Sequence, residues 1–375
     1  MLQAYSAPRR RRWPLILVAL FAVIAALWAG GWYFASGQLE ARIAVWKERE
    51  ARAGRLHNCG SLAIGGFPFR IEVRCADADA EFRAPPLALK TREIVISAAA
   101  WRPTVLNVVF IGPLTVRDPG QPGPVVVNWR SARTQLHGLP TAPESASIRL
   151  EEPTLDRTSG GGLEQVFKAS RADVDGRILE GTARDNPVVE LVIKLIEASA
   201  PTLHPAAARP LDADITAVLR GLKDFSPKPW PARLRELQAL GGRLEITKAR
   251  VQQGDTIAVA TGVLGISPRG RLDGQLRLTV ANLERLMPAL GLDKLLAPQA
   301  QPNQLSAAFG ALDRIAPGLG NVARQNAAPA IVAGVNLLGQ QTELEGKRAV
   351  SLPLRFNDGA VSLGPLPLGQ VPPLY

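Results

Sequence analysis

Cys59 and Cys75 are the residues whose type and spacing most directly predict a chemical bond, because they are the only cysteines of this 375-residue chain. Between them, apolar residues alternate with small or charged ones on both sides of a Gly-Gly-Phe-Pro-Phe centre, which is typical of two strands joined by a turn. Opposed positions of an antiparallel hairpin have a constant sum, so we expect Cys59 to face Cys75 directly across a turn centred on Phe67. The predicted turn comprises Gly66, Phe67, Pro68 and Phe69.

A disulfide between the two cysteines closes a loop of about 17 residues and stabilises the fold by ~3 kcal/mol in the chain-entropy model. It also implies an oxidising compartment. Two unrelated free thiols are the alternative. A zinc site is a weaker alternative, because the chain has three histidines and only His57 lies near a cysteine. We therefore predict no metal site.

Two acidic pairs are the remaining candidates for catalysis, since general acid–base chemistry needs convergent titratable groups. They are Glu151 with Glu152 and Asp212 with Asp214. The first pair precedes a proline at the predicted end of a strand and the second alternates with an alanine, so both are expected on solvated faces. No serine lies in a nucleophile elbow and no phosphate-binding loop is complete. The sequence predicts no catalytic residue, no cofactor and no enzymatic activity; an envelope hydrolase that uses Glu151 or Asp212 is the alternative.

Composition indicates a folded chain with many turns. Hydrophobic residues make up 46% and charged residues 21%, while aromatic residues make up only 5%, so the apolar content is mainly aliphatic. The chain contains 34 glycines and 31 prolines, which favours short elements over long helices. Its length can hold one large domain or two ordinary ones.

The net charge of +11 is concentrated at the N-terminus. Residues 1–55 contain nine Lys or Arg and three Glu, so this segment alone carries +6. The other basic residues are scattered and are not interleaved with aromatic ones, which disfavours a nucleic-acid partner. Clustered positive charge beside an apolar segment has a membrane explanation instead.

Residues 13–35 contain no charged residue and are long enough to cross the roughly 30 Å hydrocarbon core as a helix. Aromatic residues toward both ends fit the interfacial belts of such helices. A cleaved signal peptide is the alternative, but the run is long and ends in bulky aromatics. Four arginines precede the run: Arg9, Arg10, Arg11 and Arg12. By the positive-inside rule, residues 1–12 form a cytoplasmic tail and the rest of the chain is exported.

Residues 36–56 predict a juxtamembrane helix, because their apolar residues fall near one helical face with nearly balanced charges on the others. An interfacial helix lying on the membrane surface is the alternative.

Residues 57–375 predict a β-rich domain. Short apolar or alternating segments recur between Pro and Gly turns, and GVLGISPRGRLDGQLRLTV has the pattern of a strand–turn–strand meander. Consecutive antiparallel strands of this kind build a wide, curved sheet. Residues 188–196 and 211–220 fit either a strand or a short helix. Residues 231–240 have helical spacing with a proline at the start, and 357–359 have the residue types of a hairpin turn.

A helical insert is expected at about residues 282–338, where helical spacing is interrupted by prolines and glycines. One apolar stripe in it belongs either to the core or to an apolar groove. The stripe comprises Phe309, Leu312, Ile315 and Leu319. The predicted fold class is α+β and dominated by β-structure: an N-terminal transmembrane helix followed by a large curved antiparallel sheet with a few short packed helices.

Several features together resemble the bacterial family known as domain of unknown function 2125. They are the apolar anchor, the GFPFR stretch at residues 66–70 between the cysteines, the late GG-x-L segment at residues 241–244 and the tail LPLRFNDGAVSLGPLPLGQVPPL. The resemblance covers nearly the whole chain and implies an architecture and a location rather than catalytic residues. The chain is also loosely similar to AsmA-like envelope proteins, in which an anchored β-rich body is thought to carry lipid across the periplasm.

We therefore expect a non-enzymatic, single-pass protein of a bacterial inner membrane, with a cytoplasmic N-terminus and a periplasmic body. Its aliphatic strands predict a sheet that binds or transfers a lipid or another apolar envelope molecule, since acyl chains need burial rather than specific hydrogen bonds. Membrane lipid is the expected partner. An envelope scaffold or assembly factor that holds another protein is the alternative.

Overall fold

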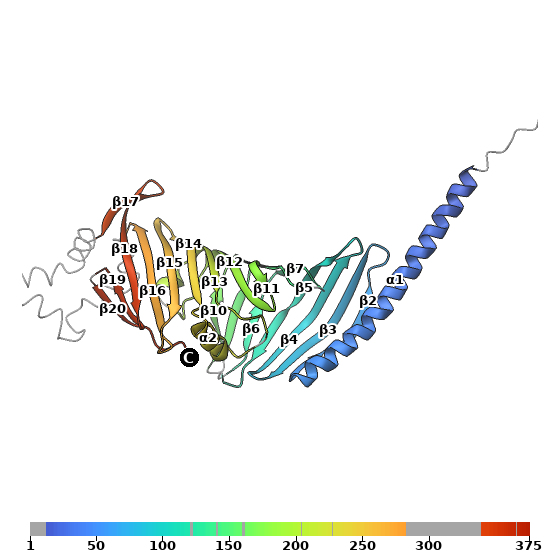
Figure 1. Ribbon diagram of the computed structural model, residues 1–375, viewed down its shortest axis with the longest axis horizontal. Coiled ribbons are helices and arrows are strands. Elements are labelled where there is room, and N and C mark those ends of the chain that lie inside the picture. The colour runs from blue at the N-terminus through green and yellow to red at the C-terminus, as the bar shows by residue number, and fades with distance from the viewer. Residues whose placement is uncertain are drawn as a thin grey trace, which may run out of the picture.

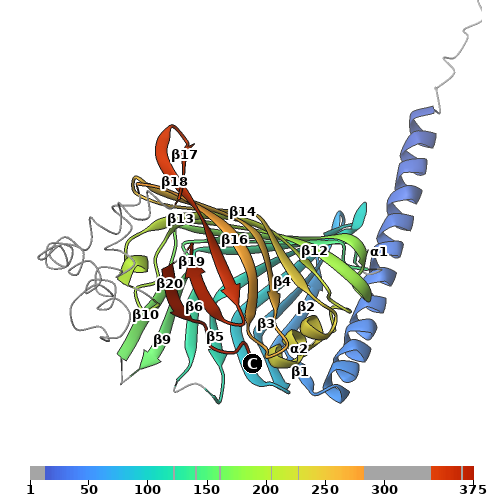
Figure 2. The same cartoon turned by 60° about the vertical axis from the view of Figure 1, so that its left-hand side comes forward.

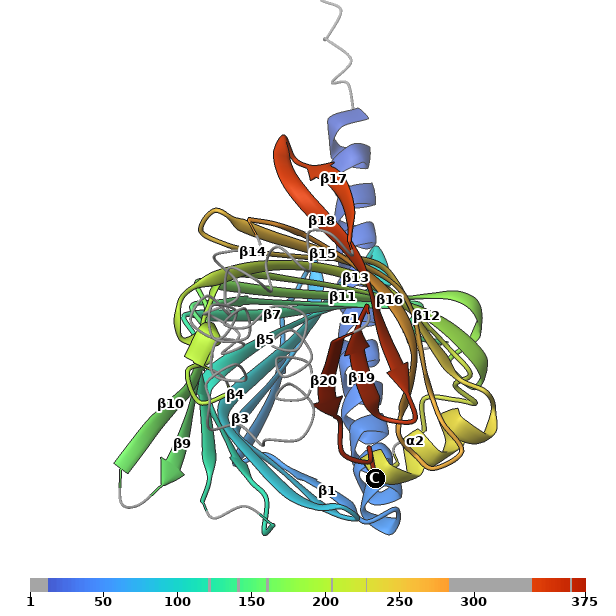
Figure 3. The ribbon, with the colours of Figure 1, turned by 90° about the vertical axis from the view of Figure 1, so that its left-hand side faces the viewer.

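The computed structural model describes residues 13–375 except 121–122, 140–141, 160–161, 204, 227, 283–338 and 365. It shows one long helix, α1 (Trp13–Arg52), at one end of a single large antiparallel sheet (Figure 1). The sheet is strongly twisted (Figure 2) and forms an arch when viewed from its far end (Figure 3). The predicted fold class, dominated by a curved antiparallel sheet behind an N-terminal apolar helix, is confirmed.

Twenty strands make up this sheet within the described residues. They are β1 (Arg55–Asn58), β2 (Ser61–Gly65), β3 (Arg70–Arg83), β4 (Pro86–Ala99), β5 (Arg102–Arg117), β6 (Val125–Asn128), β7 (Ser131–His137), β8 (Ser145–Glu151), β9 (Thr154–Ser159), β10 (Gly162–Lys168), β11 (Arg171–Thr182), β12 (Asp185–Ala198), β13 (Leu211–Arg220), β14 (Arg243–Gln253), β15 (Thr256–Ile266), β16 (Leu272–Ala281), β17 (Gln340–Leu344), β18 (Lys347–Asn357), β19 (Ala360–Leu363) and β20 (Leu366–Gln370). A short 3-10 helix, η1 (Pro205–Ala208), lies between β12 and β13.

The strands follow one another across the sheet nearly in chain order. The main path runs β2–β3–β4–β5–β7–β8–β11–β12–β13–β14–β15–β16–β18–β19–β20, and every pairing in it is antiparallel. β6, β9 and β10 lie beside this path and also pair antiparallel, β6 with β5 and β9, and β9 with β10. Many neighbours in this path are joined by short turns, as the spacing of Pro and Gly predicts, whereas longer segments separate β13 from β14 and β16 from β18.

Two strands had an ambiguous pattern. Residues 188–196 and 211–220, which fit a strand or a helix, belong to β12 and β13. Their apolar runs are short enough for either element, and pairing with neighbours decides the outcome. The predicted turn at 357–359 joins β18 to β19, where Asp358 and Gly359 have φ angles of 49° and 83°, as hairpin turns with two left-handed residues require.

Helix α2 (Trp230–Ala239) confirms the helix predicted at 231–240. Pro231 lies in its first turn, where a missing N–H costs nothing, and Gly241 follows its end with φ 63°. The helix packs against one end of the sheet and against the C-terminus. The buried centre of this contact comprises Leu222, Leu234 and Leu237, with Val189, Leu219, Ile266, Leu374 and Tyr375 packed around it.

Helix α1 is one continuous element, whereas the sequence divided it into residues 13–35 and 36–56. No proline interrupts it, and residues 38–52 are mostly strong helix formers, so the apolar half continues directly into the charged half. The helix ends earlier than predicted: Gly54 follows it with φ 77°, and β1 begins at Arg55. The expected helical insert at 282–338 lies outside the described residues from 283 onward.

Candidate functional site

An apolar band crosses the sheet from β2 to β18. Side chains two residues apart in a strand point to the same face, and the register aligns these faces from strand to strand. The central row of aligned positions is Ile64, Val73, Ile96, Val108, Thr134, Ile148, Val174, Ile193, Ile215, Ala249, Ala260, Leu278 and Leu352. On one side runs the row Leu62, Cys75, Ile94, Phe110, Ala132, Leu150, Ala172, Leu195, Ala213, Val251, Ala258, Val280 and Val350. On the other side runs the row Ile71, Ala98, Leu106, Leu136, Ala146, Gly176, Leu191, Ala217, Ile246, Gly262, Leu276 and Leu354.

We call these three rows the apolar face. Thr134 is the single residue in them with a polar side-chain oxygen or nitrogen. The central row crosses thirteen strands in twelve steps, which at ~4.8 Å per step gives a path of roughly 58 Å along the sheet. No single strand shows this continuity, because each contributes only two or three of the residues.

The opposite face of the same strands carries charged side chains with valines between them, and a small apolar cluster of Ile257, Ala281 and Ala349 lies on it beside β17. The row that alternates with the central one includes Arg74, Arg133, Arg149, Asp173, Lys194, Asp214 and Arg250. Several of these residues and their neighbours pair across strands, for example Arg177 Nε with Glu190 Oε2 at 2.6 Å and Lys248 Nζ with Asp214 Oδ2 at 2.5 Å. Exposed pairs of this kind contribute well under ~1 kcal/mol each, so they suit a face in contact with water.

Much of the apolar face is open. In the central row only Val108 and Leu352 are buried, and Ile96 and Ile148 are 36% and 41% exposed. A sheet with one apolar face ordinarily buries that face under a second layer. All described strands belong to the one sheet, so no second sheet of described residues covers it, and α2 packs at one end only. An exposed apolar surface of this extent makes this face the candidate binding surface of the described structure.

A hollow of about 1040 Å³ lies on the other side of the sheet, toward β14–β18. Its charged lining residues are Arg243, Asp273, Arg277 and Arg355, and several glycines there leave the backbone uncovered. It is wide open and belongs to the charged face, so it is not an entrance to the apolar face.

The predicted disulfide is present: Cys59 and Cys75 are joined, with their Cα atoms 5.3 Å apart. The predicted register is wrong. Cys75 lies opposite Leu62, and Cys59 lies in the short break between β1 and β2. The bridge therefore ties this break diagonally to β3, where the Gly60 N–H also donates to the Ala76 carbonyl over 2.8 Å.

The turn that joins β2 to β3 contains the four predicted residues, Gly66 to Phe69. Its centre lies between Pro68 and Phe69 rather than at Phe67. The innermost pair of the hairpin is Gly65 with Glu72, and the midpoint of the chain between them is at this position. Alternation places each side chain on a face, but it does not determine how many residues the turn takes up, and so it left the register open.

The turn contacts helix α1, which the sequence did not predict. The Trp28 Nε1–H donates to the Pro68 carbonyl and the Trp32 Nε1–H to the Arg70 carbonyl, each over 2.9 Å. The Phe67 ring packs on Trp32 and Tyr33, with ring centroids 5.5 Å and 6.0 Å away. The spacing of Trp28 and Trp32, one helical turn apart, was the available signal, because it places both indoles on one side of the helix.

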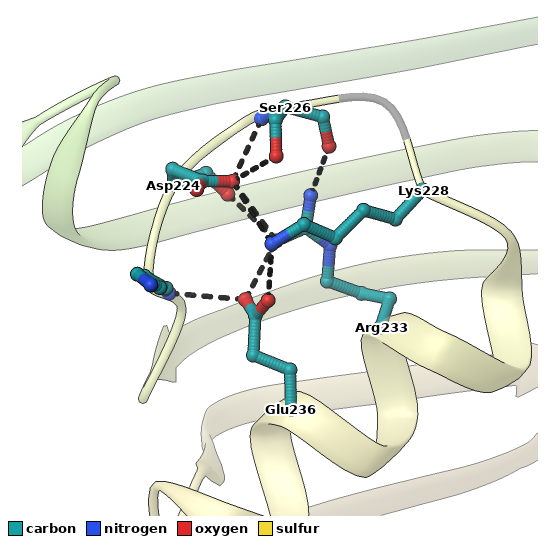
Figure 4. A network of polar contacts seen from close by, with 6 residues as sticks. Asp224, Ser226, Lys228, Arg233 and Glu236 are labelled. Carbon is teal, nitrogen blue, oxygen red and sulfur yellow. Dashed lines mark hydrogen bonds and ion pairs between the residues drawn. The ribbon is translucent and has the colours of Figure 1, made fainter.

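A polar network holds the loop before α2 against the helix (Figure 4). Lys228 Nζ contacts Asp224 Oδ1 at 3.4 Å and also pairs with Glu236, while Arg233 Nη1 lies 2.7 Å from Glu236 Oε1. Hydrogen bonds from Ser226 lower the pKa of Asp224 to about 2, and the bond from Lys228 lowers that of Glu236. Both carboxylates are therefore held in their charged form, which suits a structural clasp rather than proton transfer.

The acidic pairs considered for catalysis do not converge on an open site. Glu151 and Glu152 each pair with Arg130, at 3.3 Å and 3.2 Å. Asp212 Oδ1 accepts a hydrogen bond from the Glu197 N–H over 2.8 Å, and the neighbouring Asp214 pairs with lysine. Within the described residues, no group of three or more His, Cys, Asp or Glu has metal-binding geometry.

Two groups of predicted residues lie outside the described part of the chain. They are the basic residues Arg9, Arg10, Arg11 and Arg12, and the apolar stripe Phe309, Leu312, Ile315 and Leu319.

In the part of the chain that the structure describes, fold and site together define a class of protein: an antiparallel sheet, apolar on one face, attached to a helix that is long and apolar enough to cross a membrane. The chain belongs to the bacterial family DUF2125, described as an uncharacterized protein conserved in bacteria, whose model matches residues 32–372. No curated protein and no solved structure matches the chain. The looser similarity to AsmA-like envelope proteins has no support in these comparisons.

Proposed function

We propose that this protein is anchored by α1 in a bacterial inner membrane and holds the acyl chains of a lipid, or another apolar envelope molecule, on the apolar face of its periplasmic sheet. The observation that carries the proposal is the continuity of three apolar rows across twelve or thirteen strands. Acyl chains need a long apolar surface and few hydrogen bonds, and such burial contributes roughly 25 cal/mol per Å².

Several features support the orientation. A basic cluster precedes the apolar half of α1, and positive charge stays on the cytoplasmic side of a membrane helix. The Cys59–Cys75 disulfide then lies on the exported side, where an oxidising compartment maintains it. The charged pairs described above favour contact with water on their own face. The apolar rows favour contact with lipid on the other face.

The apolar face also favours carriage over catalysis. Its rows contain no titratable group apart from a cysteine held in the disulfide, so the one hydroxyl in them, that of Thr134, has no acid or base among them to activate it for chemistry on a bound lipid. We therefore propose binding or transfer rather than an enzymatic reaction.

Photocrosslinking on adjacent positions of one strand tests the proposal. Benzoylphenylalanine is placed at Ile193, on the apolar face of β12, or at Lys194, on the charged face, in the full chain expressed in bacteria. β12 lies seven strand steps from β2, or ~34 Å along the sheet, so contact with the bilayer beside α1 does not account for an adduct. Mass spectrometry should find a lipid adduct at position 193 and none at 194. Equal labelling at both positions, no lipid at either, or a protein adduct at 193 would each contradict the proposal, and the protein adduct would favour a scaffold.

A further inference from the structure

The contact between α1 and the β2–β3 turn places that turn at a definite depth relative to the membrane helix. Trp32 lies three residues and Trp28 seven residues before Ala35, the end of the uncharged run. At about 1.5 Å per residue these positions are ~5 Å and ~10 Å inside the run. The whole run is ~35 Å long against a hydrocarbon core of roughly 30 Å, so residues hydrogen-bonded to Trp28 and Trp32 lie at the core boundary or below it.

The side chains at this edge of the sheet suit such a position. Phe67 and Phe69 in the turn are 48% and 64% exposed, and Trp101 in the neighbouring β4–β5 turn is 67% exposed. The rings of Phe69 and Trp101 are 6.5 Å apart, so two adjacent turns present one aromatic cluster. Arg70, the first residue of β3 directly after the turn, pairs with Glu72 at 3.2 Å but is exposed, so it is placed to reach lipid phosphates. Aromatic rings with nearby arginine are typical of the membrane–water interface.

Four backbone carbonyls in and directly after the β2–β3 turn are hydrogen-bonded, which suits an apolar surrounding. A carbonyl without a partner is costly where water is absent, so irregular chain does not enter the hydrocarbon unless its polar groups are paired. The Gly66 carbonyl accepts from the Arg70 N–H and the Phe69 carbonyl from the Ala100 N–H, over 3.1 Å and 2.9 Å. The two indoles of α1 pair with the carbonyls of Pro68 and Arg70, and Pro68 has no N–H to satisfy.

We propose that the aromatic edge, formed by Phe67, Phe69 and Trp101, is inserted into the outer leaflet of the membrane that α1 crosses, so that the sheet stands edge-on to the bilayer. The occupant of this surface is the lipid bilayer itself, because the edge is bonded to the membrane helix within its apolar run. Phe69 directly precedes β3 and is two residues from Ile71, and Val73 and Cys75 continue this spacing on the same face. The apolar face therefore begins at the inserted edge. Lipid therefore has a continuous apolar path from the bilayer onto the sheet.

This inference rests on α1 spanning the membrane and not on lipid being carried along the sheet, so the two proposals fail separately. It is tested on the full chain in vesicles of phosphatidylcholine and phosphatidylglycerol that carry bromine at a shallow or a deep acyl position. Bromine quenches tryptophan fluorescence on contact. The signal of Trp101 is the difference between the wild type and Trp101→Phe. The control signal is the difference between the wild type and Trp129→Phe.

Trp129 donates to the Phe110 carbonyl over 2.9 Å, eight positions along β5 from the start of that strand at Arg102, or ~26 Å away from the aromatic edge. We expect shallow bromine to remove most of the Trp101 signal and to leave the Trp129 signal unchanged. A Trp101 signal that survives both bromine positions would overturn the insertion. Equal quenching of both tryptophans would overturn the edge-on orientation and indicate a sheet lying flat on the bilayer.

Discussion

Trp28 and Pro68 are forty positions apart in the chain, and the Trp28 indole donates a hydrogen bond to the Pro68 carbonyl oxygen over 2.9 Å. This bond and its neighbour from Trp32 connect helix α1 to the first long hairpin of the sheet. The orientation of the sheet relative to α1 is therefore not left to the short connection at residues 53–54 alone.

Removing these two donors should loosen the hairpin without unfolding the sheet. In the double variant Trp28→Phe, Trp32→Phe, both rings stay apolar but two carbonyls lose their partners, at a cost of roughly 1–3 kcal/mol each. Hydrogen exchange of the full chain in vesicles should show faster exchange of the Arg70 and Ala100 amides, with β14 and β15 unaffected. Trp13→Phe, at an exposed position on the same helix, is the matched control and should change nothing. Unaltered exchange in the double variant would show that the indole bonds do not hold the turn.

The disulfide should act as a stabilising clamp with no chemical role. Replacing both cysteines, Cys59→Ser with Cys75→Ser, should lower the free energy of unfolding by ~3 kcal/mol, because the unfolded chain regains the freedom of the closed loop. Thermal unfolding measures this loss. Reductant should lower the melting temperature of the wild type and leave the double variant unchanged. An identical melting temperature for the two oxidised proteins would mean that the bridge is idle.

A charge placed on the apolar face should abolish lipid capture at little cost in stability. Ile215→Glu puts a carboxylate beside the crosslinking position at Ile193, with which it is paired in register, and β13 is partly exposed there. The lipid adduct formed at position 193 should be lost, because a desolvated carboxylate opposes an acyl chain. Thr216→Glu, one residue on and on the opposite face, is the control and should keep the adduct. Loss of the adduct in both variants would indicate a general defect in folding.

The clasp before α2 should make stability fall in acid. Asp224 and Glu236 have pKa values below their ordinary ones of 3.8 and 4.5, that of Asp224 being about 2. The two charged carboxylates therefore add to the free energy of unfolding when the pH is above their ordinary pKa values. This contribution is lost as the pH falls through their lowered pKa values. The melting temperature should decrease between about pH 4.5 and pH 2, and less steeply in Glu236→Gln. Glu164→Gln, at an exposed position on β10, serves as the control and should follow the wild type.

Much of this architecture follows from local patterns in the chain. An uncharged run after four arginines predicts the apolar helix, two cysteines in an alternating segment predict the disulfide, and proline and glycine spacing predicts α2 and the turn at 357–359. Each of these depends on residues close together in sequence. Such interactions are decided by the periodicity and conformational preferences of a few neighbouring residues, whatever the rest of the chain does.

Tertiary structure alone decided the register, and with it the candidate site. Alternation shows that Ile193 and Ile215 each lie on an apolar side of a strand, but only pairing shows that they are adjacent and that eleven other strands continue the row. Only the tertiary structure shows the diagonal position of Cys59 and the hydrogen bond from Trp28 to Pro68, because both depend on how separate segments are placed. Register depends on turn lengths and on contacts between distant segments, and a shift of one residue would place every aligned side chain on the other face.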